Sequence, residues 1–517
     1  MENTVQSGPQ SEKADLSAWL AVLAGTISSF MATLDISIVN AALPTIQGEV
    51  GASGTEGTWI STSYLVAEII MIPLTGWFVR TLKLRNFLII CAAIFVSFSV
   101  ICGISDSLMM MVIGRLGQGF AGGALIPTAI IVVATRLPRS QQPVGTALFG
   151  MTVILGPIIG PLLGGWLTEN FSWHYAFFVN VPVCAGLFVL LFTAMPHENA
   201  QWRDLLKIDL LGFYGLAAGL GGLTVVLEEG QRERWFESAF IIKMTILTIS
   251  GFLSLIGSQF QSRRPVVRLS LLLERSFCSV VIVVMSVGLI LFGVMFMIPQ
   301  FLSTVAGYNT ENSGLVVLLS GIPTIVLLPF VPKLLKLVDV RILVGSGLAF
   351  FFIACYLNSN LTADVGGVHF VAGQLVQGCG LALTMLPLNQ AAISSVSQEH
   401  ITDASGLFSA ARNLGGSIGL ALISTYQDRR LDYHLQTIGS SVTANSVKAQ
   451  DAISGYAHQL GNTTEALAKL WMVIQRQALV MTYSDLFWIF AFIIVGTMPL
   501  ILLMKPIRDT GVSHAMH

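Results

Sequence analysis

The stretch RLGQGFAGGALIP, at residues 115–127, has a counterpart in QLVQGCGLALTMLP, at residues 374–387. A Leu and a Gln-Gly pair stand at matching positions, and both stretches lie within long apolar runs. Further along, ALFGMTVILGPIIG at 147–160 matches GLFSAARNLGGSIG at 406–419. Motifs that return in the same order predict two halves of similar architecture, and a substrate site between such halves is typical of transporters.

The composition of the chain is that of a membrane protein. Of its 517 residues, 54% are hydrophobic and 11% are charged, and its mean hydropathy is +0.76. A soluble globular chain carries roughly 25% charged residues, so this much apolar surface requires a cover of membrane lipid. The formal net charge of −1 argues against nucleic acid as a partner.

Residues that commonly bind metals or cofactors form no recognisable pattern in the sequence. The six cysteines lie in apolar runs without a CxxC pair, and the eight histidines fall mostly in loops or at the ends of apolar runs. We therefore predict no metal site, no cofactor and no disulfide framework, and no Walker A motif indicates direct use of ATP. The polar first 15 residues do not resemble a signal peptide, so the first apolar run is expected to remain as a span.

Fourteen apolar runs are long enough to cross a bilayer, which takes about 20 residues of helix. They cover residues 17–43, 58–79, 86–105, 107–135, 142–167, 174–195, 208–228, 238–258, 276–304, 311–332, 340–360, 368–396, 402–426 and 484–505. The matched motifs are eight runs apart, whereas two six-helix halves alone would give an offset of six. The predicted fold is therefore an all-α polytopic membrane protein with two extra helices inserted between two six-helix halves.

The basic residues of the loops predict the orientation of the spans. One set of loops is rich in Lys and Arg, whereas the short loops on the other side carry only Arg232 and Arg234. The basic set comprises Arg80, Lys83, Arg85, Arg136, Arg139, Arg203, Lys207, Arg263, Arg264, Arg268, Arg275, Lys333, Lys336 and Arg341, joined by Lys13, Lys505 and Arg508 near the termini. The positive-inside rule places this set and both termini in the cytoplasm, which requires an even number of spans.

These observations divide the chain into consecutive parts. The predicted parts are a cytoplasmic tail at 1–15, a six-helix bundle at 16–200, two inserted helices at 201–262, a second six-helix bundle at 263–506 and a cytoplasmic tail at 507–517. The second bundle contains a long outer loop at 427–483.

Few ionisable residues lie deep inside the predicted spans. They are Asp35 and Glu68 among the acids and Arg115 and Arg412 among the bases. A carboxylate at a helix centre costs roughly 2.5–3.5 kcal/mol on insertion scales, so such a residue tends to face a cavity or a partner. At about 1.5 Å of rise per residue, Asp35 and Arg115 lie at similar depths in the outer half, while Glu68 and Arg412 both lie near mid-span.

Proton coupling is the first interpretation of these charges. An antiporter needs a carboxylate that binds a proton in one state and releases it in another, and movement of a nearby Arg would drive this change. Asp35, Glu68 and Arg115 are therefore candidate proton-coupling residues. The alternatives are a fixed structural ion pair between Asp35 and Arg115, and binding of a cationic substrate by Glu68.

The other polar residues of the spans support less specific hypotheses. Arg412 is a candidate partner of an anionic substrate or of a carboxylate, or else a structural residue of the second half. Gln118 and Gln377 occupy matching positions in the repeat and are candidate polar groups of the packing or of a cavity.

A glycine- and proline-rich motif, GPIIGPLLGG, fills residues 156–165. Its notable residues are Gly156, Pro157, Gly160, Pro161, Gly164 and Gly165. Glycines four apart let neighbouring helices approach closely, and proline frees backbone carbonyls and bends a helix. The motif is interpreted either as a packing surface or as a flexible gate, and both can hold.

Three of these motifs resemble the signatures of the fourteen-span drug:proton antiporters of the major facilitator superfamily. They are LDISIVNAALP at 34–44, RLGQGFAGGALIP at 115–127 and GPIIGPLLGGW at 156–166, each on its proper span. The chain resembles EmrB-type multidrug efflux proteins from about residue 16 to residue 506. The resemblance implies the major facilitator fold, a gating role for GPIIGPLLGG, and proton-driven efflux of hydrophobic or amphipathic toxic compounds across a bacterial inner membrane.

Other functions follow less directly from the sequence. One alternative is export of a single physiological solute, such as a fatty acid or a siderophore. A polytopic membrane enzyme would need a cluster of polar catalytic residues at one membrane face, and the sequence shows none. We therefore predict a transporter rather than an enzyme.

One loop departs from the pattern of the resembled superfamily. The loop after the second span usually carries an acidic residue that takes part in a lock between helices. Here the segment reads GWFVRTLKLRN, at 76–86, and Arg80 stands at the acidic position. The usual lock cannot form in the same way, which leaves open how the two halves are held together.

The outer loop at 427–483 contains two amphipathic stretches separated at Gly461 and Asn462. One interpretation is a helical hairpin that lies on the outer face of the membrane. The other, implied by the resemblance to EmrB-type tripartite pumps, is a docking surface for a periplasmic membrane-fusion adaptor that leads to an outer-membrane channel.

Overall fold

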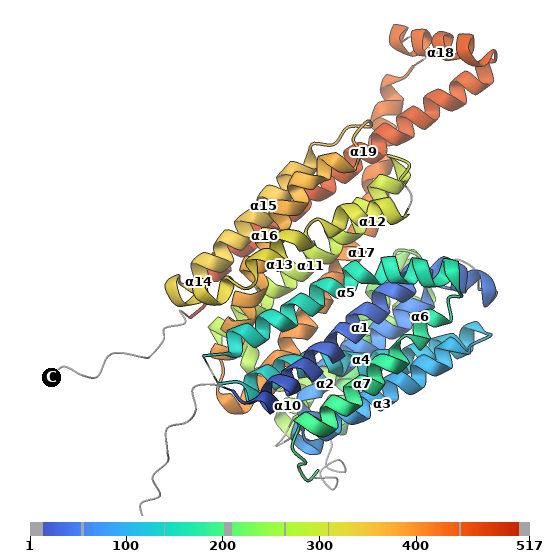
Figure 1. Ribbon diagram of the computed structural model, residues 1–517. Coiled ribbons are helices and arrows are strands. Elements are labelled where there is room, and N and C mark those ends of the chain that lie inside the picture. The colour runs from blue at the N-terminus through green and yellow to red at the C-terminus, as the bar shows by residue number, and fades with distance from the viewer. Residues whose placement is uncertain are drawn as a thin grey trace, which may run out of the picture.

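The computed structural model describes residues 14–52, 56–138, 140–200, 209–262, 265–308, 310–443 and 446–505. Most of the predicted tail at 1–15, the tail at 507–517 and the basic residues Arg139, Arg203, Lys207, Arg263 and Arg264 lie outside the described residues. Throughout the described ranges the regular structure is helical, in a bundle of long helices without strands (Figure 1). This agrees with the predicted all-α class.

The helices follow the order of the predicted apolar runs. Their bounds are α1 Leu16–Glu49, α2 Trp59–Leu82, α3 Leu84–Gly103, α4 Leu108–Arg136, α5 Gln142–Asn170, α6 Tyr175–Phe178, α7 Asn180–Ala194, α8 Leu210–Leu216, α9 Gly222–Glu229, α10 Ala239–Gln261, α11 Arg275–Thr304, α12 Thr310–Leu318, α13 Gly321–Leu327, α14 Val331–Leu337, α15 Val340–Ser359, α16 Gly367–Ser394, α17 Ile401–Ser441, α18 Val447–Leu460 and α19 Thr463–Thr497. A π-helical turn, η2 at Ala217–Gly221, joins α8 to α9, and a 3₁₀ segment, η6 at Met498–Leu503, follows α19.

The two halves pack their helices in the same way, as the sequence repeat predicts. In the first half, α1 packs on α5, and α4 packs on both α2 and α3. In the second half, α11 packs on α17, and α16 packs on both α13 and α15. Each half therefore has its own apolar core, and the repeated motifs occupy equivalent helices.

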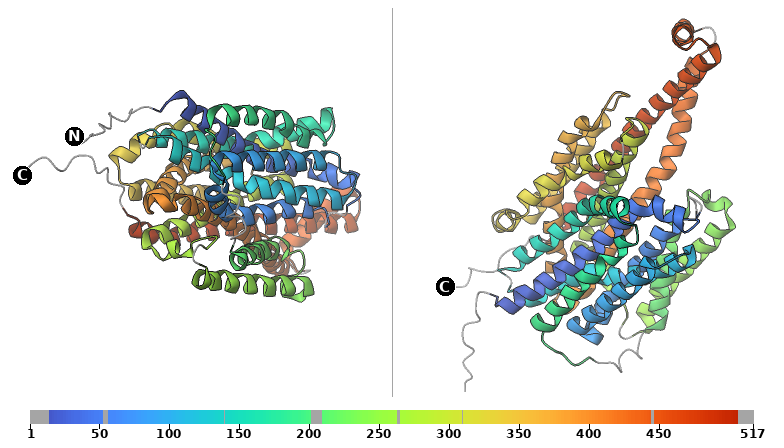
Figure 2. Two further views of the ribbon diagram at one scale, coloured as in Figure 1. Left: turned by 90° about the horizontal axis from the view of Figure 1, so that it is seen from below. Right: turned by 45° about the vertical axis from the view of Figure 1, so that its right-hand side comes forward.

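The inserted helices lie at a seam between the halves. α9 packs on α2 of the first half and on α17 of the second half, while α10 covers α8 and α9 from the other side. In Figure 2 these helices form a separate layer beside the bundle. The insertion thus contributes residues to the interface of the halves and does not only connect them.

The number of spans is supported only in part. In the described residues, twelve helices are long and apolar enough to cross a membrane, or thirteen if Asn312–Leu327 and Val331–Leu337, which meet at a bend of 55°, count as one. The remaining predicted span, at 402–426, belongs to α17, which is not among these helices. It nevertheless packs within the bundle against α2, α11 and α19.

Residues 427–483 are not a separate loop or a hairpin on the membrane face. α17 continues without a break to Ser441, and α19 begins at Thr463, so both helices extend beyond the bundle and carry α18 at their tip (Figure 2). We call residues 427–483 the projection, although its base is part of the bundle, since Val480 and Tyr483 belong to the core of the second half. The predicted break is present, since Gly461 has a φ of +73° and the side chain of Asn462 caps α19 by accepting from the backbone N–H of Thr464.

The first and last described residues, Ala14 and Lys505, lie at the same end of the bundle, opposite the projection (Figure 1). Near the start of α1, the backbone N–H of Ala14 donates to Gln141 at the start of α5. Near the end of η6, the carbonyl of Met504 accepts from Arg341 at the start of α15. This end is called the terminal end, and it also holds many of the basic loop residues used to predict orientation.

The motif GPIIGPLLGG allows α5 to approach α1 closely. A Cβ at Gly156 would lie 2.3 Å from Thr33 Oγ1, one at Gly160 2.2 Å from Ser37 Cβ, and one at Gly164 2.7 Å from the carbonyl of Ile38. Gly415 and Gly419 bring α17 equally close to α11. The packing interpretation of the motif is therefore supported by geometry, whereas its role as a gate stays a prediction.

Gly160→Ala is expected to lower the thermal unfolding midpoint of the purified protein in detergent. Overpacking of a tight contact costs roughly 1–3 kcal/mol, and the methyl group would meet the rigid start of the Ser37 side chain. The matched control is Gly165→Ala in the same motif, where the added methyl group has open space within 4 Å. Equal destabilisation by both substitutions would contradict this account of the motif.

Candidate functional site

Asp35 lies at the centre of a polar cluster inside the first half. Its side chain is fully buried on α1, and its Oδ2 pairs with an Nη of Arg115 on α4 at 2.6 Å. Its Oδ1 accepts from the amides of Gln118, at 3.1 Å, and Asn180, at 2.7 Å. The contact between Asp35 and Arg115 expected from their equal depth is thus present, and Gln118 belongs to the same cluster.

Arg115 is fixed from several sides. Its Nε donates to the carbonyl of Ile60 on α2, and its guanidinium lies over the ring of Tyr64 at 4.2 Å from the ring centre. An Nη also donates to Gln118 Oε1 at 3.1 Å. Four helices therefore converge on one buried ion pair, an arrangement that can either hold the half together or respond to a change in charge.

Glu68 lies at the interface of the two halves, and it does not pair directly with Arg412. The amide of Asn413 on α17 donates to Glu68 Oε1 on α2 at 3.2 Å. The Oδ1 of the same Asn413 accepts from Nε and Nη2 of Arg412 at 3.4 and 3.3 Å. The predicted proximity in depth is thus realised through Asn413, which connects the carboxylate to the guanidinium across the interface.

Gln377 does not join either acidic residue through a hydrogen bond of the described residues. On α16 its Oε1 accepts from the amide of Gln374 at 3.1 Å, and both side chains are buried. Gln374 takes the repeat position of Arg115, so the second half carries an uncharged counterpart of the Asp35 cluster. Among these clusters, the ionisable side chains therefore lie in the first half and at the interface.

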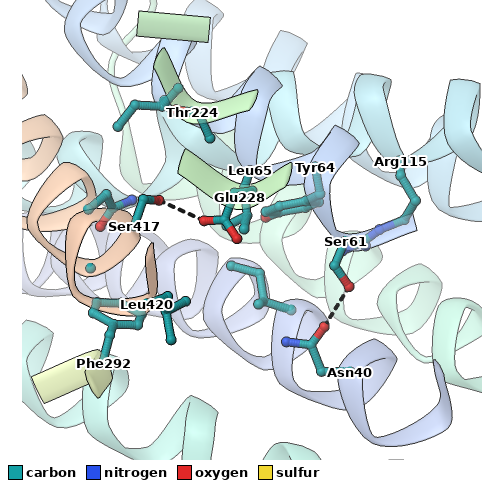
Figure 3. A pocket seen from close by; sticks show the side chains of 14 residues that line it. Asn40, Ser61, Tyr64, Leu65, Arg115, Thr224, Glu228, Phe292, Ser417 and Leu420 are labelled. Atoms are coloured by element: carbon teal, nitrogen blue, oxygen red, sulfur yellow. Dashed lines mark hydrogen bonds between the residues drawn. The ribbon is translucent and has the colours of Figure 1, made fainter. Parts of the chain in front are cut away.

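A cavity of about 150 Å³ lies between the halves, beside both acidic clusters (Figure 3). Its lining comes from α1, α2, α4, α9, α11 and α17, and comprises Ile36, Asn40, Ser61, Tyr64, Leu65, Ile69, Arg115, Thr224, Glu228, Phe292, Asn413, Gly416, Ser417 and Leu420. Arg115 belongs to both the Asp35 cluster and the cavity wall, and Asn413 belongs to both the wall and the Glu68 contact. A molecule in this cavity would therefore touch residues that hold both carboxylates.

Sequence reasoning missed several residues of this site. Asn180 and Asn413 are buried or half-buried amides that carry no charge, so nothing in the sequence distinguished them from other polar residues of the spans. Two further acids belong to this region, because Glu229 is also fully buried and Glu228 lines the cavity. Glu228 is the last residue of the predicted run 208–228 and Glu229 follows it, and only the packing of α9 on α2 and α17 shows that they lie at the interface.

At the terminal end the halves are joined by an ion pair whose basic residue lies on α2 of the first half and whose acid lies on α17 of the second half. Arg80 at the end of α2 pairs with Asp403 at the start of α17, at 2.5 Å, and Arg268 approaches the other oxygen of Asp403 at 3.8 Å. Asp403 is buried, and α2 and α17 lie close together here, since a Cβ on Gly76 would meet its carboxylate. The basic residue in place of the usual acid is therefore matched by an acid from the opposite half, which the sequence analysis did not identify.

Asp403→Asn is expected to weaken the contact between the halves at the terminal end. It should favour a conformation in which the halves are separated at this end and closed at the end of the projection. One or two kcal/mol corresponds to a factor of 5–30 in a two-state ratio, and the exposed faces of both Arg side chains argue for the lower part of this range. The readout is the labelling rate of Asn40→Cys in the cavity by a membrane-impermeant maleimide applied from the side of the projection. We expect about a fivefold decrease.

The matched control for this variant is Glu399→Gln, an exposed acid at the same end. Cys278 and Cys379, the two cysteines that are not fully buried, are replaced by Ser in all variants. An unchanged labelling rate in Asp403→Asn would mean that the pair of Arg80 and Asp403 does not control closure.

Comparisons with known proteins agree with the fold. Residues 25–420 match the family model of the Major Facilitator Superfamily. The chain is 31% identical to the colistin resistance protein EmrB of Acinetobacter baumannii, over 93% of this chain and 95% of that protein. It is 31% identical to the multidrug export protein EmrB of Escherichia coli, over 95% and 96%, and 29% identical to the fatty acid resistance protein FarB of Neisseria gonorrhoeae, over 96% and 97%.

A solved structure has the same fold. The human organic anion transporter MFSD10 superposes with a TM-score of 0.59 over 92% of this chain and 99% of its own, at 14% sequence identity. The family match, the extent of the EmrB relatives and the two related halves around a central cavity lead to one assignment. The chain belongs to the Major Facilitator Superfamily and, within it, to the EmrB-type transporters.

Proposed function

We propose that this protein exports hydrophobic or amphipathic toxic compounds in exchange for protons, by alternating access of a central site. The observation that carries the proposal is the position of Arg115, which pairs with the buried Asp35 and also lines the cavity between the halves. A substrate in the cavity and a proton on Asp35 can therefore both change the contacts of the Arg115 guanidinium. The relatives named for colistin resistance and multidrug export support drugs as the substrate class.

The geometry suggests how coupling would work. While Arg115 contacts Asp35, the carboxylate is paired with the guanidinium and also accepts from Gln118 and Asn180. The ionised form is then stabilised, and binding of a proton is not favoured. When Arg115 moves toward the cavity, the buried carboxylate loses this compensation and binding of a proton becomes favourable. Glu68 would follow the same logic, because rearrangement of α17 against α2 separates it from Asn413.

Alternating access requires that the halves close at one end at a time. In this structure they meet at the terminal end, through Arg80 and Asp403 and through an apolar contact of α5 with the second half. That contact consists of Ala147, Leu328, Val331, Ala382 and Leu386. Breaking these contacts while closing the opposite end would move the cavity from one side of the membrane to the other.

The decisive experiment is substrate-induced proton movement in proteoliposomes of the purified protein. An imposed proton gradient should drive uptake of a fluorescent amphipathic compound into inverted vesicles, and addition of the compound should in turn release protons. Uptake that is independent of the gradient, and absent proton release, would refute antiport.

A second candidate function is export of a single physiological solute, such as a fatty acid or a siderophore. The similarity to FarB, which is named for fatty acid resistance, favours the fatty acid form of this alternative. The same vesicles distinguish the two functions. A broad set of compounds that compete with one another supports multidrug efflux, whereas exchange restricted to one solute class supports the alternative.

The proposal includes a place in the cell and a partner. The basic loops at the terminal end favour a cytoplasmic location for both termini in a bacterial inner membrane. The projection would then stand in the periplasm, where its length and exposed helices suit a membrane-fusion adaptor connected to an outer-membrane channel. Exposed apolar side chains on it, including Val447, Leu467, Trp471 and Met472, support a protein contact.

A further inference from the structure

We propose that Glu228, on the inserted helix α9, forms a subsite of the central cavity that binds the cationic group of a lipophilic cation, such as a quaternary ammonium or phosphonium compound. The proposal rests on the proposed function and specifies one substrate class for it. It also assigns a chemical role to the inserted helices, which the repeat alone leaves as an addition between two complete halves.

The position of Glu228 is set by the packing of α9. This helix lies against α2 and α17, and its last turn directs Glu228 to the cavity, where Oε1 accepts from the hydroxyl of Ser417 at 2.8 Å. In Figure 3 the carboxylate of Glu228 lies between Ser417 and Tyr64, with the second oxygen turned into the cavity. The side chain is half-buried, so it is accessible from the cavity itself.

The neighbouring Glu229 is a carboxylate of the same helix whose charge is neutralised by a basic side chain. It is 1% exposed, pairs with an Nη of Arg232 at 2.6 Å and accepts from the hydroxyl of Thr62 at 2.9 Å. Among the described residues, Glu228 has no Lys, Arg or His nitrogen within 4.0 Å. Two consecutive acids therefore differ in kind, since one is neutralised inside the protein and the other is not.

With Asp35, Glu68 and Glu228 ionised, the charges around the cavity sum to one negative charge in excess. Asp35 is paired with Arg115, and Glu68 is connected through Asn413 to Arg412. Unlike these two carboxylates and Glu229, Glu228 has only a hydroxyl partner among the described residues. A charged group in a site of low dielectric strongly favours an opposite charge, so the cavity as a whole prefers a cation.

The remaining wall suits the apolar body of such a cation. Phe292, Leu65, Ile69 and Leu420 contribute apolar surface, and Tyr64 adds an aromatic ring. A cation beside aromatic rings gains a further attraction to their faces. The arrangement of one carboxylate on a mostly apolar wall is therefore complementary to a lipophilic cation and offers little to a small hydrophilic ion.

The test uses two probes of the same shape and opposite charge, tetraphenylphosphonium and tetraphenylborate. Binding of each to the purified protein in detergent is measured by equilibrium dialysis for the wild type, Glu228→Gln, Glu228→Asp and Glu233→Gln. Glu233 is a matched acid of the following turn that does not line the cavity. Thermal unfolding of each variant establishes that it is folded, and Glu228→Asp retains the charge if Gln at this site disturbs folding.

The proposal predicts that Glu228→Gln weakens tetraphenylphosphonium binding at least tenfold and does not weaken tetraphenylborate binding. Glu228→Asp should retain most of the affinity, and Glu233→Gln should match the wild type. Unchanged phosphonium binding in Glu228→Gln, or a wild type that binds no phosphonium, would overturn the subsite.

Failure of this subsite and failure of the proposed function can be told apart. Proton-coupled transport of uncharged or anionic compounds by a protein that does not bind phosphonium through Glu228 would leave efflux intact and remove the subsite. Glu228-dependent phosphonium binding without any coupled transport would keep the subsite and remove efflux.

Discussion

Asp35→Asn should reduce drug-dependent proton exchange in proteoliposomes by at least about a hundredfold, the scale of roughly 3 kcal/mol. The substitution removes the ionisable group around which Arg115, Gln118 and Asn180 converge. A carrier that cannot bind a proton at this position cannot couple, although drug can still enter the cavity. Exchange is measured with a pH-sensitive dye after addition of substrate, and drug binding is measured separately.

The hydrogen bonds around Asp35 require a control for stability. All of these neighbours donate to the carboxylate, so the NH₂ group of Asn must face at least one donor. An unsatisfied buried group costs about 1–3 kcal/mol, and some loss of thermal stability is therefore expected in addition to the loss of coupling. Asp106→Asn, an exposed acid in the loop before α4, serves as the neutral control.

Glu68→Gln tests the second candidate proton-coupling residue and should disturb the hydrogen bonds of the protein less than Asp35→Asn does. The side-chain oxygen of Gln can still accept from Asn413, so the contact between the halves is retained while the charge is lost. Strongly reduced exchange in this folded variant would indicate a proton role for Glu68. If Asp35→Asn and Glu68→Gln together exchange protons for drug at the wild-type rate, neither residue carries a proton. If coupling of Asp35→Asn recovers whenever the protein is stabilised, the ion pair is structural.

Deletion of residues 442–462, with a short Gly-Ser linker from α17 to α19, should abolish drug resistance in cells and spare transport in liposomes. α17 and α19 form part of the bundle, whereas α18 and its connections lie beyond it at the tip of the projection (Figure 1). On the proposed function, export across two membranes would need an adaptor, whereas movement across one bilayer would need only the bundle. Resistance is measured as the minimal inhibitory drug concentration, expected to equal that of cells without the protein.

A second variant tests the contact without altering the chain length. Trp471→Ser with Met472→Ser changes exposed apolar side chains of α19 within the projection, and should reduce copurification of the adaptor. Intact adaptor binding in the deletion variant would contradict docking at α18. Loss of transport in liposomes would instead indicate that the tip of the projection is needed for the structure of the bundle.

Much of the fold follows from the sequence because lipid imposes strong local rules. An apolar run of span length must form a helix in a bilayer, since every backbone group has to be bonded within the segment. The repeated motifs then identify equivalent helices, and the structure packs α1 on α5 as it packs α11 on α17. Equal depth was enough to predict the contact of Asp35 with Arg115, because both lie on helices of one half.

Other features depend on contacts between distant segments. In the sequence, Arg80 only marked the absence of the usual acidic residue. In the structure, Asp403 supplies the opposite charge from a helix more than three hundred residues later. The division of 311–337 into bent segments and the extension of α17 and α19 into the projection also depend on neighbouring helices. Hydropathy averages over a window, so it does not report where a helix bends or where it leaves the bundle.

By itself the sequence determined the membrane environment, the two related halves, the inserted pair of helices and four ionisable residues that lie deep inside the spans. Only the tertiary structure decided which charges meet, that Asn413 stands between Glu68 and Arg412, and that Glu228 faces the cavity from α9. The physical reason is the range of the interactions. Burial in lipid and helical hydrogen bonding act along the chain, whereas the pairing of charges across an interface depends on how helices rotate and pack against one another.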